Sequence, residues 1–300
     1  MKQPAAVYRR SPETAPLLQY FLGEQSNGAK KLTDDAYPRG IGRCFVTRPI
    51  QPFVDEPWFL DNGVFPAWNR PDENGDSRTP GRSFDAEYAN FESRIPRASE
   101  LSAEGRGPSF MVIPDRPGEG AESLLESLSW LDKYLSEGLA WDNDPVLCHT
   151  GYADLPLYLA VQDGMVPADL EWGFNEDENG MVIDPSLDGY TGCVDGIMGE
   201  PVLWKISGIF IGGTDEFKKN TLADWREFCD KHSLKLHYGR CTQSRLQEAV
   251  DAGGDSGDSS HPLRLGGTRW ARFLEVFDKV VGRRAKKLTP WPSWVTGDAA

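Results

Sequence analysis

The sequence predicts an α/β protein, a (β/α)8 TIM-like barrel that forms a single domain with loop insertions. Short apolar runs are followed by carboxylates, amides or glycines, and helical stretches separate one run from the next. The chain has 300 residues with 39% hydrophobic content, enough for one large core. In a parallel barrel the carboxyl ends of the strands meet at one mouth, so polar residues placed there converge on one pocket.

The first half of the chain has the expected alternation of strands and helices. Residues 1–42 are polar and proline-rich around one short amphipathic piece, and we predict an N-terminal extension there, followed by the barrel at 43–282. Strands are predicted from β-type or buried apolar runs, helices from apolar residues at three- or four-residue spacing, and loops from Pro, Gly and Asp. The predicted elements are strand Arg43–Thr47, strand Trp58–Leu60, a surface loop at 69–83, helix Phe84–Ile95, strand Phe110–Ile113 and helix Ala121–Leu139.

The second half repeats this alternation around one acidic, glycine-rich insertion. That insertion, at 165–205, lacks clear periodicity and is expected near the mouth. A basic tail rich in Trp and Pro is predicted at 283–300. The predicted elements are strands Val146–His149, Leu155–Gln162, Ile206–Ile211, Leu234–Tyr238 and Gly254–Asp258, and helices Asp215–Lys231, Thr242–Ala252 and Trp270–Val281.

The charge distribution restricts the possible partners. A formal charge of −14 and a pI near 4.8 argue against non-specific affinity for nucleic acid, since phosphate binding depends on Lys and Arg. Residues 261–288 differ, with eight basic and two acidic side chains. We interpret this segment either as a phosphate-contacting surface or as an ordinary solvated helix.

Targeting and metal-binding signals are absent from the sequence. No stretch approaches the roughly 20 apolar residues of a membrane span, and the first residues lack the apolar core of a signal peptide. We therefore expect no membrane partner and a cytoplasmic location, the host cytoplasm if the protein is viral. The five cysteines are scattered without the C-x₂₋₄-C spacing of a structural zinc site, so we predict reduced thiols and no metal site.

Five strand ends carry residues able to do chemistry. Each has an ordinary interpretation as well: an Asp before Asn-Gly or after Pro is often a turn or cap residue, and a Gly-Gly pair allows a sharp turn. Their occurrence at successive strand ends favours a shared functional site. The candidates are Asp61, Asp115, Gln162, the pair Gly212 and Gly213, and Asp258.

These motifs, in this order, resemble the tRNA-guanine transglycosylase superfamily, and more closely its DpdA-type branch, which modifies DNA. The similarity covers about residues 43 to 280, and its most specific parts are the Ile-Gly-Gly-Thr and Asp-Ser-x-Asp elements. The motifs that carry it are Leu60-Asp61-Asn62-Gly63, Val112-Ile113-Pro114-Asp115, Val161-Gln162-Asp163-Gly164, Gly208 to Thr214 with Lys218, His237-Tyr238-Gly239-Arg240 and Gly254 to Ser259.

The resemblance implies exchange of guanine in DNA for a 7-deazaguanine such as preQ0, without a cofactor. Asp258 would be the nucleophile on C1′ and would form a covalent sugar–enzyme intermediate, with Asp61 as general acid/base. Asp115 and Gln162 would pair with the edge of the base, and the backbone N–H of Gly212 or Gly213 with its carbonyl. The target nucleotide has to leave its stack to reach such a pocket.

Two departures from the tRNA enzymes keep other interpretations open. No cysteine follows Asp258, so their zinc site is missing, and the usual Asp-Ser-Gly-Gly motif is Asp61-Asn62-Gly63-Val64 here, as in the DNA branch. The alternatives are a tRNA transglycosylase without the zinc module, a carboxylate-dependent barrel glycoside hydrolase, and a non-catalytic nucleobase binder. His237, Arg240 and Lys218 are candidates for contact with nucleic-acid phosphate, although a core histidine is an equal interpretation of His237.

Overall fold

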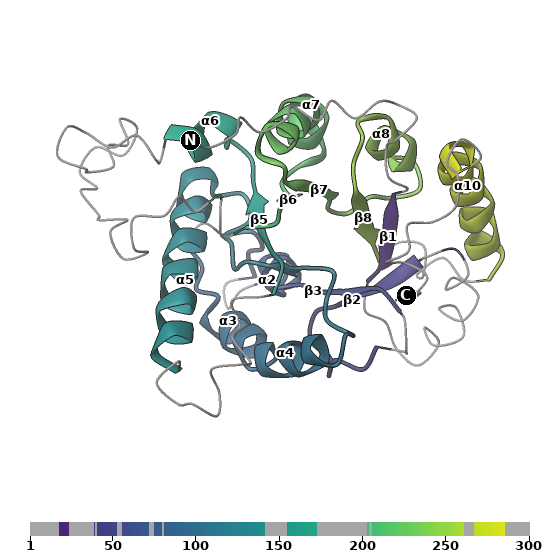
Figure 1. Cartoon of the computed structure of the whole chain (residues 1–300). Helices are drawn as coiled ribbons and strands as arrows, with labels where there is room; N and C mark the ends of the chain where they lie inside the picture. The colour runs from purple at the N-terminus through teal and green to yellow at the C-terminus, as the bar shows by residue number, and fades with distance from the viewer. Residues whose placement is uncertain are drawn as a thin grey trace, which may run out of the picture.

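A closed parallel barrel forms the body of the protein. The computed structural model describes residues 18–23, 39, 41–52, 56–71, 75–79, 81–141, 155–172, 203, 206–260 and 267–285. Within them, eight parallel strands pair in sequence order, and β1 pairs with β8 to close the barrel. Helices surround the strands on the outside (Figure 1). The predicted fold class is confirmed.

The strands are short and the helices longer. The strands are β1 (Gln19–Leu22), β2 (Ile41–Phe45), β3 (Trp58–Leu60), β4 (Met111–Val112), β5 (Leu157–Val161), β6 (Gly208–Ile211), β7 (Lys235–Tyr238) and β8 (Ser256–Ser259). The helices are α2 (Val64–Trp68), α3 (Asp85–Glu92), α4 (Ile95–Ala103), α5 (Gly120–Trp141), α6 (Pro167–Trp172), α7 (Asp215–His232), α8 (Leu246–Asp251) and α10 (Gly267–Ala285).

Both faces of strands such as β3, β4 and β5 are buried, and their sequences are continuous apolar runs. In β5, Leu157, Leu159 and Val161 face the surrounding helices, whereas Tyr158 and Ala160 belong to a separate cluster inside the barrel. Because side chains alternate along a strand, strands β1 to β6 divide their apolar residues between these two cores.

Aromatic rings fill the inside of the barrel. Phe59 stacks on Phe110 with ring centroids 4.5 Å apart, and Phe110 stacks on Tyr158 at 4.1 Å. We call this inner cluster the aromatic plug; its buried members are Phe21, Cys44, Phe59, Phe110, Val112, Tyr158 and Ala160, with Val46 and Phe210 packed against them. A barrel filled in this way is a packed core, so a ligand has access only from its ends.

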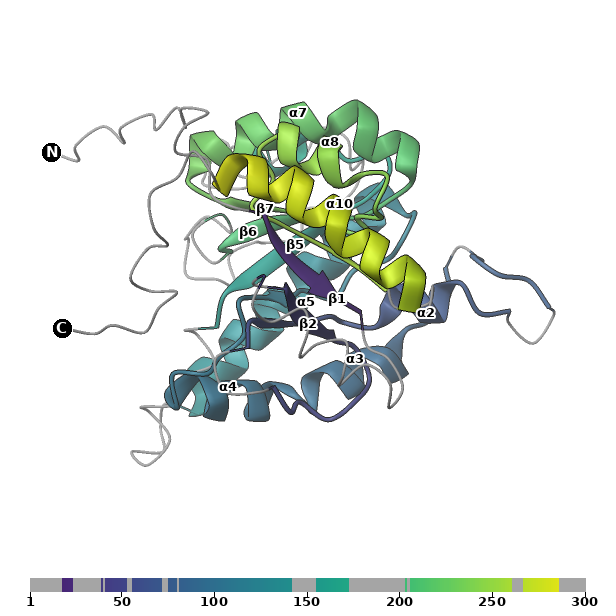
Figure 2. The same ribbon diagram turned by 90° about the vertical axis from the view of Figure 1, so that its right-hand side faces the viewer.

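The outer helices follow from ordinary helix signals. Thr214 caps α7 by accepting a hydrogen bond from the backbone N–H of Phe217, and acidic residues occupy the first turn and basic residues the last. The helix ends where Ser233 adopts a left-handed φ of 58°. At the closure of the barrel, α10 lies across β1 (Figure 2), where Phe273 and Phe277 pack against the ring of Tyr20.

The predicted N-terminal boundary of the barrel is wrong. Strand β1 lies inside the segment expected to be an extension, and it pairs with both β2 and β8. The cause is its length: four residues, all but one buried, are too few to show strand periodicity and resemble an amphipathic fragment. Barrel closure requires it, because without β1 the edges of β2 and β8 would remain open.

Other boundaries differ locally. Helix α4 was not predicted. Helix α3 ends at its C-cap Ser93, and α4 begins directly afterwards, with Arg94 as its N-cap and a proline in its first turn. Helix α8 begins at Leu246, four residues later than predicted, since Thr242 to Arg245 form a turn closed by a 2.9 Å backbone hydrogen bond.

Parts of several predictions fall on residues that the structure does not describe. Outside the described residues lie the predicted strand Val146–His149, the tail at 286–300 and most of the 165–205 insertion; α6 is the helix seen in that insertion. Among the helices that are described, none has the length and apolarity needed to cross a membrane.

Candidate active site

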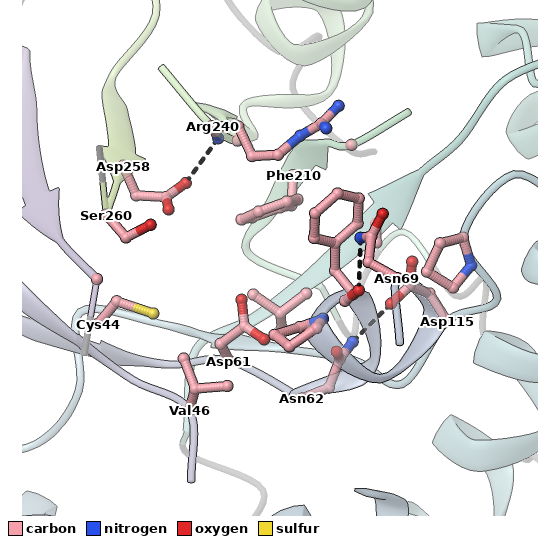
Figure 3. A pocket seen from close by; sticks show the side chains of 18 of the residues that line it. Cys44, Val46, Asp61, Asn62, Asn69, Asp115, Phe210, Arg240, Asp258 and Ser260 are labelled. Carbon is pink, nitrogen blue, oxygen red and sulfur yellow. Dashed lines mark hydrogen bonds between the residues drawn. The ribbon is translucent and has the colours of Figure 1, made fainter. Parts of the chain in front are cut away.

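A pocket of about 870 Å3 opens at the carboxyl ends of the barrel strands, on top of the aromatic plug. The plug forms the floor of this pocket. Residues that belong to the plug or pack against it also line the pocket, among them Cys44, Val112, Ala160 and Phe210. The volume is typical of small-molecule sites. The pocket is lined by predicted residues from the loops after β3 to β7 and from strand β8: Asp61, Asp115, Gln162, Gly212, Gly213, Arg240 and Asp258. Figure 3 shows Asp258 and Arg240 on one side and Asp61, Asn62 and Asp115 on the other.

Asp61 follows β3 and is held by the turn after it. Gly63, with a left-handed φ of 79°, donates its backbone N–H to Oδ1 of Asp61 at 2.7 Å. Burial raises the pKa of Asp61 to about 7; this N–H opposes the increase, and the negative charges of Asp258 and Asp115 add to it. A carboxyl group with this pKa exchanges a proton readily near neutral pH.

Asp115 follows β4 and lies between two amides. Asn62 Nδ2 donates to its Oδ1 at 2.7 Å, and Gln162 Nε2 donates to its Oδ2 at 2.5 Å. Burial raises the pKa of Asp115 to about 6, and the two amide hydrogen bonds lower it in part. The residue is 5% exposed, and its carboxylate has further lone pairs to offer a ligand with paired N–H groups.

Asn62 is a site residue that the sequence analysis did not identify. Its amide also donates to the Ile113 carbonyl at 2.9 Å, and its oxygen accepts the N–H of Val64 at 3.0 Å. It therefore joins the loop after β3 to the loop after β4 and orients Asp115. The sequence feature that could have identified Asn62 is its position next to Asp61. An ordinary turn with the sequence Asp-Asn-Gly accounts for an asparagine at this position equally well.

The two predicted backbone donors, the N–H groups of Gly212 and Gly213, both have partners within the protein. The N–H of Gly212 donates to the Val161 carbonyl at 2.9 Å, and the N–H of Gly213 donates to Gln162 Oε1 at 2.8 Å. A Cβ at Gly212 would lie 2.6 Å from Gln162 Nε2, so this glycine makes room for that amide. The sequence could not show this, because the side chain that accepts the hydrogen bond from the Gly213 N–H belongs to Gln162, 51 positions away in the chain.

Asp258 lies in β8 opposite Phe21 of β1, and its side chain is 15% exposed. Its Oδ1 accepts two hydrogen bonds, from His237 Nε2 at 3.1 Å and from the backbone N–H of Arg240 at 3.0 Å. Its Oδ2 accepts none from the residues that the structure describes. One oxygen is therefore fixed, and the other is available to the pocket.

His237 sits within the barrel rather than at its surface. It is fully buried and stacks on Phe210 with centroids 4.7 Å apart. Its Nδ1 lies 2.9 Å from the hydroxyl of Ser256. Burial lowers its pKa, although the hydrogen bond to Asp258 opposes this shift. In the neutral ring Nε2 carries the proton toward the carboxylate, and Nδ1 accepts from Ser256.

The predicted phosphate contacts are therefore wrong for two of three residues. His237 and Lys218 are both fully buried, so neither reaches a nucleic-acid backbone. Lys218 donates from Nζ to the Gly239 carbonyl and lies 5.3 Å from the centroid of the Tyr238 ring. The burial of His237 agrees with the alternative interpretation of a core histidine, whereas Lys218 was expected at the surface because lysines are rarely buried. Arg240 does line the pocket and remains a candidate.

Asp255, the other carboxylate of the Asp-Ser-x-Asp element, belongs to the scaffold. It forms a 2.9 Å ion pair with Arg226 of α7 and accepts the N–H of Leu236 at 2.8 Å. It thus joins β7, β8 and α7, whereas Asp258 faces the pocket. Across the residues described, no group of three or more His, Cys, Asp or Glu side chains is arranged to hold a metal ion.

Comparisons with known proteins leave the chemistry to be argued from this geometry. No family model matches the chain, and no curated protein matches it. One similar solved structure, described as "Native KDPGal structure", is 9% identical with a TM-score of 0.36 and covers 89% of this chain and 95% of its own. Another is a Yersinia pestis DHPS with a pterine-sulfa conjugate, 10% identical with a TM-score of 0.35, covering 92% and 96%. Likenesses this weak support no functional argument.

Proposed function

We propose that this protein is an enzyme, a DNA-guanine transglycosylase that exchanges guanine in DNA for a 7-deazaguanine base such as preQ0. The observation that carries the proposal is that three carboxylates around one pocket of about 870 Å3 have different surroundings. Asp61, which is partly buried, and Asp115, which is buried, have raised pKa values, whereas Asp258 is fixed through one oxygen and presents the other. Acid–base catalysis, base recognition and nucleophilic attack need these three environments.

Asp258 has the surroundings of a nucleophile on C1′. In the first step its Oδ2 forms a bond to C1′ while the C1′–N9 bond to guanine breaks, and the bonding electrons leave with N9. His237 Nε2 and the Arg240 N–H keep Oδ1 in place, so the reacting oxygen needs little reorganisation. The product is a covalent sugar–enzyme ester, reached through an oxocarbenium-like transition state.

Asp61 has the pKa of a group that handles protons in both half-reactions. In its protonated form it gives a proton to the departing guanine, and as carboxylate it then takes the N9 proton of the incoming 7-deazaguanine. That nitrogen attacks C1′, and the ester bond to Asp258 breaks with its electrons returning to Oδ2. With a pKa of about 7, both forms of Asp61 are present at neutral pH.

Asp115 and Gln162 supply recognition of the base. The Asp115 carboxylate matches the adjacent N1–H and 2-amino groups of a guanine edge. Gln162 already bridges Asp115 and the Gly213 N–H, so a base carbonyl reaches that N–H only when Gln162 turns away. We therefore expect Gln162 to move on binding and to exchange its partners for the base.

Nucleoside mass spectrometry tests this proposal. DNA and tRNA are isolated from cells that express the chain and receive preQ0, then digested to nucleosides. We expect 7-deaza deoxynucleosides with the wild type and none with Asp258→Asn, and a covalent protein–DNA adduct on guanine-containing oligonucleotides with the wild type alone. The matched control is Asp224→Asn, an exposed aspartate on α7.

The other outcomes of this experiment select among the alternatives. Modification confined to tRNA would assign the tRNA reaction. Glycan cleavage without base exchange would indicate the glycoside hydrolase that the same carboxylates could serve. Binding of preQ0 without modification of either nucleic acid, equal in wild type and Asp258→Asn, would indicate a nucleobase binder.

A further inference from the structure

Three arginines line the pocket beyond the carboxylates. Arg70 and Arg78 lie between α2 and α3 and are exposed, and Arg240 follows β7 and is half-buried. They are the basic side chains among the described residues that line this pocket. Asp115 is buried, with 5% of its surface exposed, and Asp61 is partly buried. Positive charge is therefore at the opening and carboxylates are inside, in a chain whose net charge is −14.

Resting on the proposed function, we propose that Arg70, Arg78 and Arg240, here called the arginine rim, bind the phosphodiester groups flanking the nucleotide whose base enters the pocket. The rim is distinct from the residues that contact the base, and from the basic segment at 261–288. It assigns the backbone contacts of a flipped nucleotide to two loops of the barrel itself.

Arg240 is built into the site. Its guanidinium donates to the Gly213 carbonyl and lies 4.5 Å from the centroid of the Phe65 ring. Its backbone has a left-handed φ of 53°, a conformation that costs a non-glycine residue energy unless its surroundings hold it. The hydrogen bond from its N–H to Asp258 is part of what holds it.

Arg78 is positioned in the same manner on the opposite loop. Its φ is 61°, its Nε donates to Asn69 Oδ1 at 3.0 Å, and its guanidinium lies 5.3 Å from the centroid of the Trp68 ring. Its backbone N–H donates to the Trp68 carbonyl at 2.9 Å. Stacking on aromatic rings leaves the guanidinium edge free to donate outward.

The rim arginines also act on each other electrostatically. Burial lowers the pKa of Arg240, and the positive charge of Arg78 lowers it further, while Asp215, Asp258 and Asp163 oppose this. Arg78 and Arg240 are thus close enough to interact, and an anion bound at the pocket opening would be attracted by both guanidinium groups. Phosphate suits this place because the planar guanidinium donates two parallel hydrogen bonds to it.

The net charge explains why a local rim is needed. An acidic protein gains no general attraction for DNA, and its inner carboxylates would repel a phosphate. With the arginine rim at the opening, the neutral base enters the pocket, and the anionic backbone stays at the opening, bound to the arginines. A free nucleotide would satisfy at most one phosphate contact, whereas an oligonucleotide offers one on each side of the base.

The test measures binding of a fluorescent single-stranded DNA with one guanine to Arg70→Gln, Arg78→Gln and the double variant. Arg97→Gln, an exposed arginine of α4 in an ion pair with Glu100, is the matched control. We expect each single variant to bind about tenfold more weakly. The slope of log affinity against log salt should fall by about 0.7 per arginine. Affinity for free preQ0 should not change, which separates lost backbone contacts from a damaged pocket.

The outcomes are separable from those of the proposed function. Base exchange that persists with unchanged DNA affinity and salt slope in the double variant overturns the rim and leaves the function standing. Weaker DNA binding in the rim variants, with no base exchange by the wild type, supports the rim and overturns the function. If dGMP or inorganic phosphate binds the wild type as tightly as the oligonucleotide does, the rim serves a small phosphorylated ligand and the proposal fails. Tighter binding of an RNA of the same sequence, lost in the same variants, keeps the rim and reassigns the nucleic acid.

Discussion

The pocket wall formed by β3, β4 and β5 differs from the wall formed by β7 and β8 in what surrounds its carboxylates. On the first wall, Asp61 and Asp115 face backbone N–H and amide donors, and burial raises both pKa values. On the second wall, Asp258 faces a buried histidine that packs against rings of the aromatic plug, with a strained Arg240 next to it. Aspartates on the two walls thus lie in different environments, one suited to moving protons and the other to presenting a carboxylate oxygen in a fixed orientation.

The largest effect is expected from neutralising Asp61 on the first wall. Asp61→Asn keeps the oxygen that accepts the Gly63 N–H but cannot exchange a proton, so kcat for guanine exchange should fall by about 10²- to 10⁴-fold. The rate–pH limb near 7 should disappear. Exchange of labelled guanine into DNA measures both effects, and Asp224→Asn serves as control. A retained limb would assign the proton transfer to another group.

The same substitution should stabilise the fold. The pKa of Asp61 is raised from 3.8 to about 7 in the folded state, so its contribution to stability is complete below pH 4 and is lost as the pH rises through 7. Because asparagine does not ionise, the Asp61→Asn variant should not lose this stability as the pH rises. We expect the free energy of unfolding at pH 8 to increase by about 1–3 kcal/mol and to change little at pH 4. Urea titration at the two pH values checks the sign.

A smaller effect is expected from His237, the positioning residue of the second wall. His237→Leu removes the donor to Asp258 and leaves the hydroxyl of Ser256 without its partner, so kcat should fall by about 10- to 100-fold with KM nearly unchanged. His237→Gln keeps an N–H donor and should recover part of the loss. Steady-state kinetics and a thermal melt of both variants provide the measurement. Equal losses in the two would mean that His237 only fills space.

The smallest effect is expected on base selectivity. Asp115→Asn replaces an anionic acceptor that two amides hold in place, and it should weaken binding of preQ0 by about tenfold. Affinity for hypoxanthine, which lacks the 2-amino group, should fall less. Calorimetric titration of both bases tests this, with Asp224→Asn as the unchanged reference. An equal loss for both bases would place the contact elsewhere on the purine.

The two walls also differ in how far the sequence predicted them. Asp61, Asp115, Gln162 and Asp258 were correctly expected to share a pocket, because the ends of parallel strands converge. On the second wall the expected phosphate contacts of His237 and Lys218 are wrong, and only the alternative interpretation of His237 as a core residue agrees with the structure: the two side chains are buried supports of Asp258 and of the Gly239–Arg240 turn. Nothing in the local sequence distinguishes a polar residue that faces solvent from one that faces an aromatic plug.

By itself the sequence determined the barrel, most of its elements and the strand ends at which chemistry is possible. These follow from apolar periodicity and chain order, which are local properties. Only the tertiary structure decided that β1 closes the barrel, that Asn62 and Gln162 flank Asp115, and that Gly213 donates to Gln162. Each of these depends on a hydrogen bond or strand pairing between residues some fifty or more positions apart, and such a contact leaves no trace in the spacing of either partner.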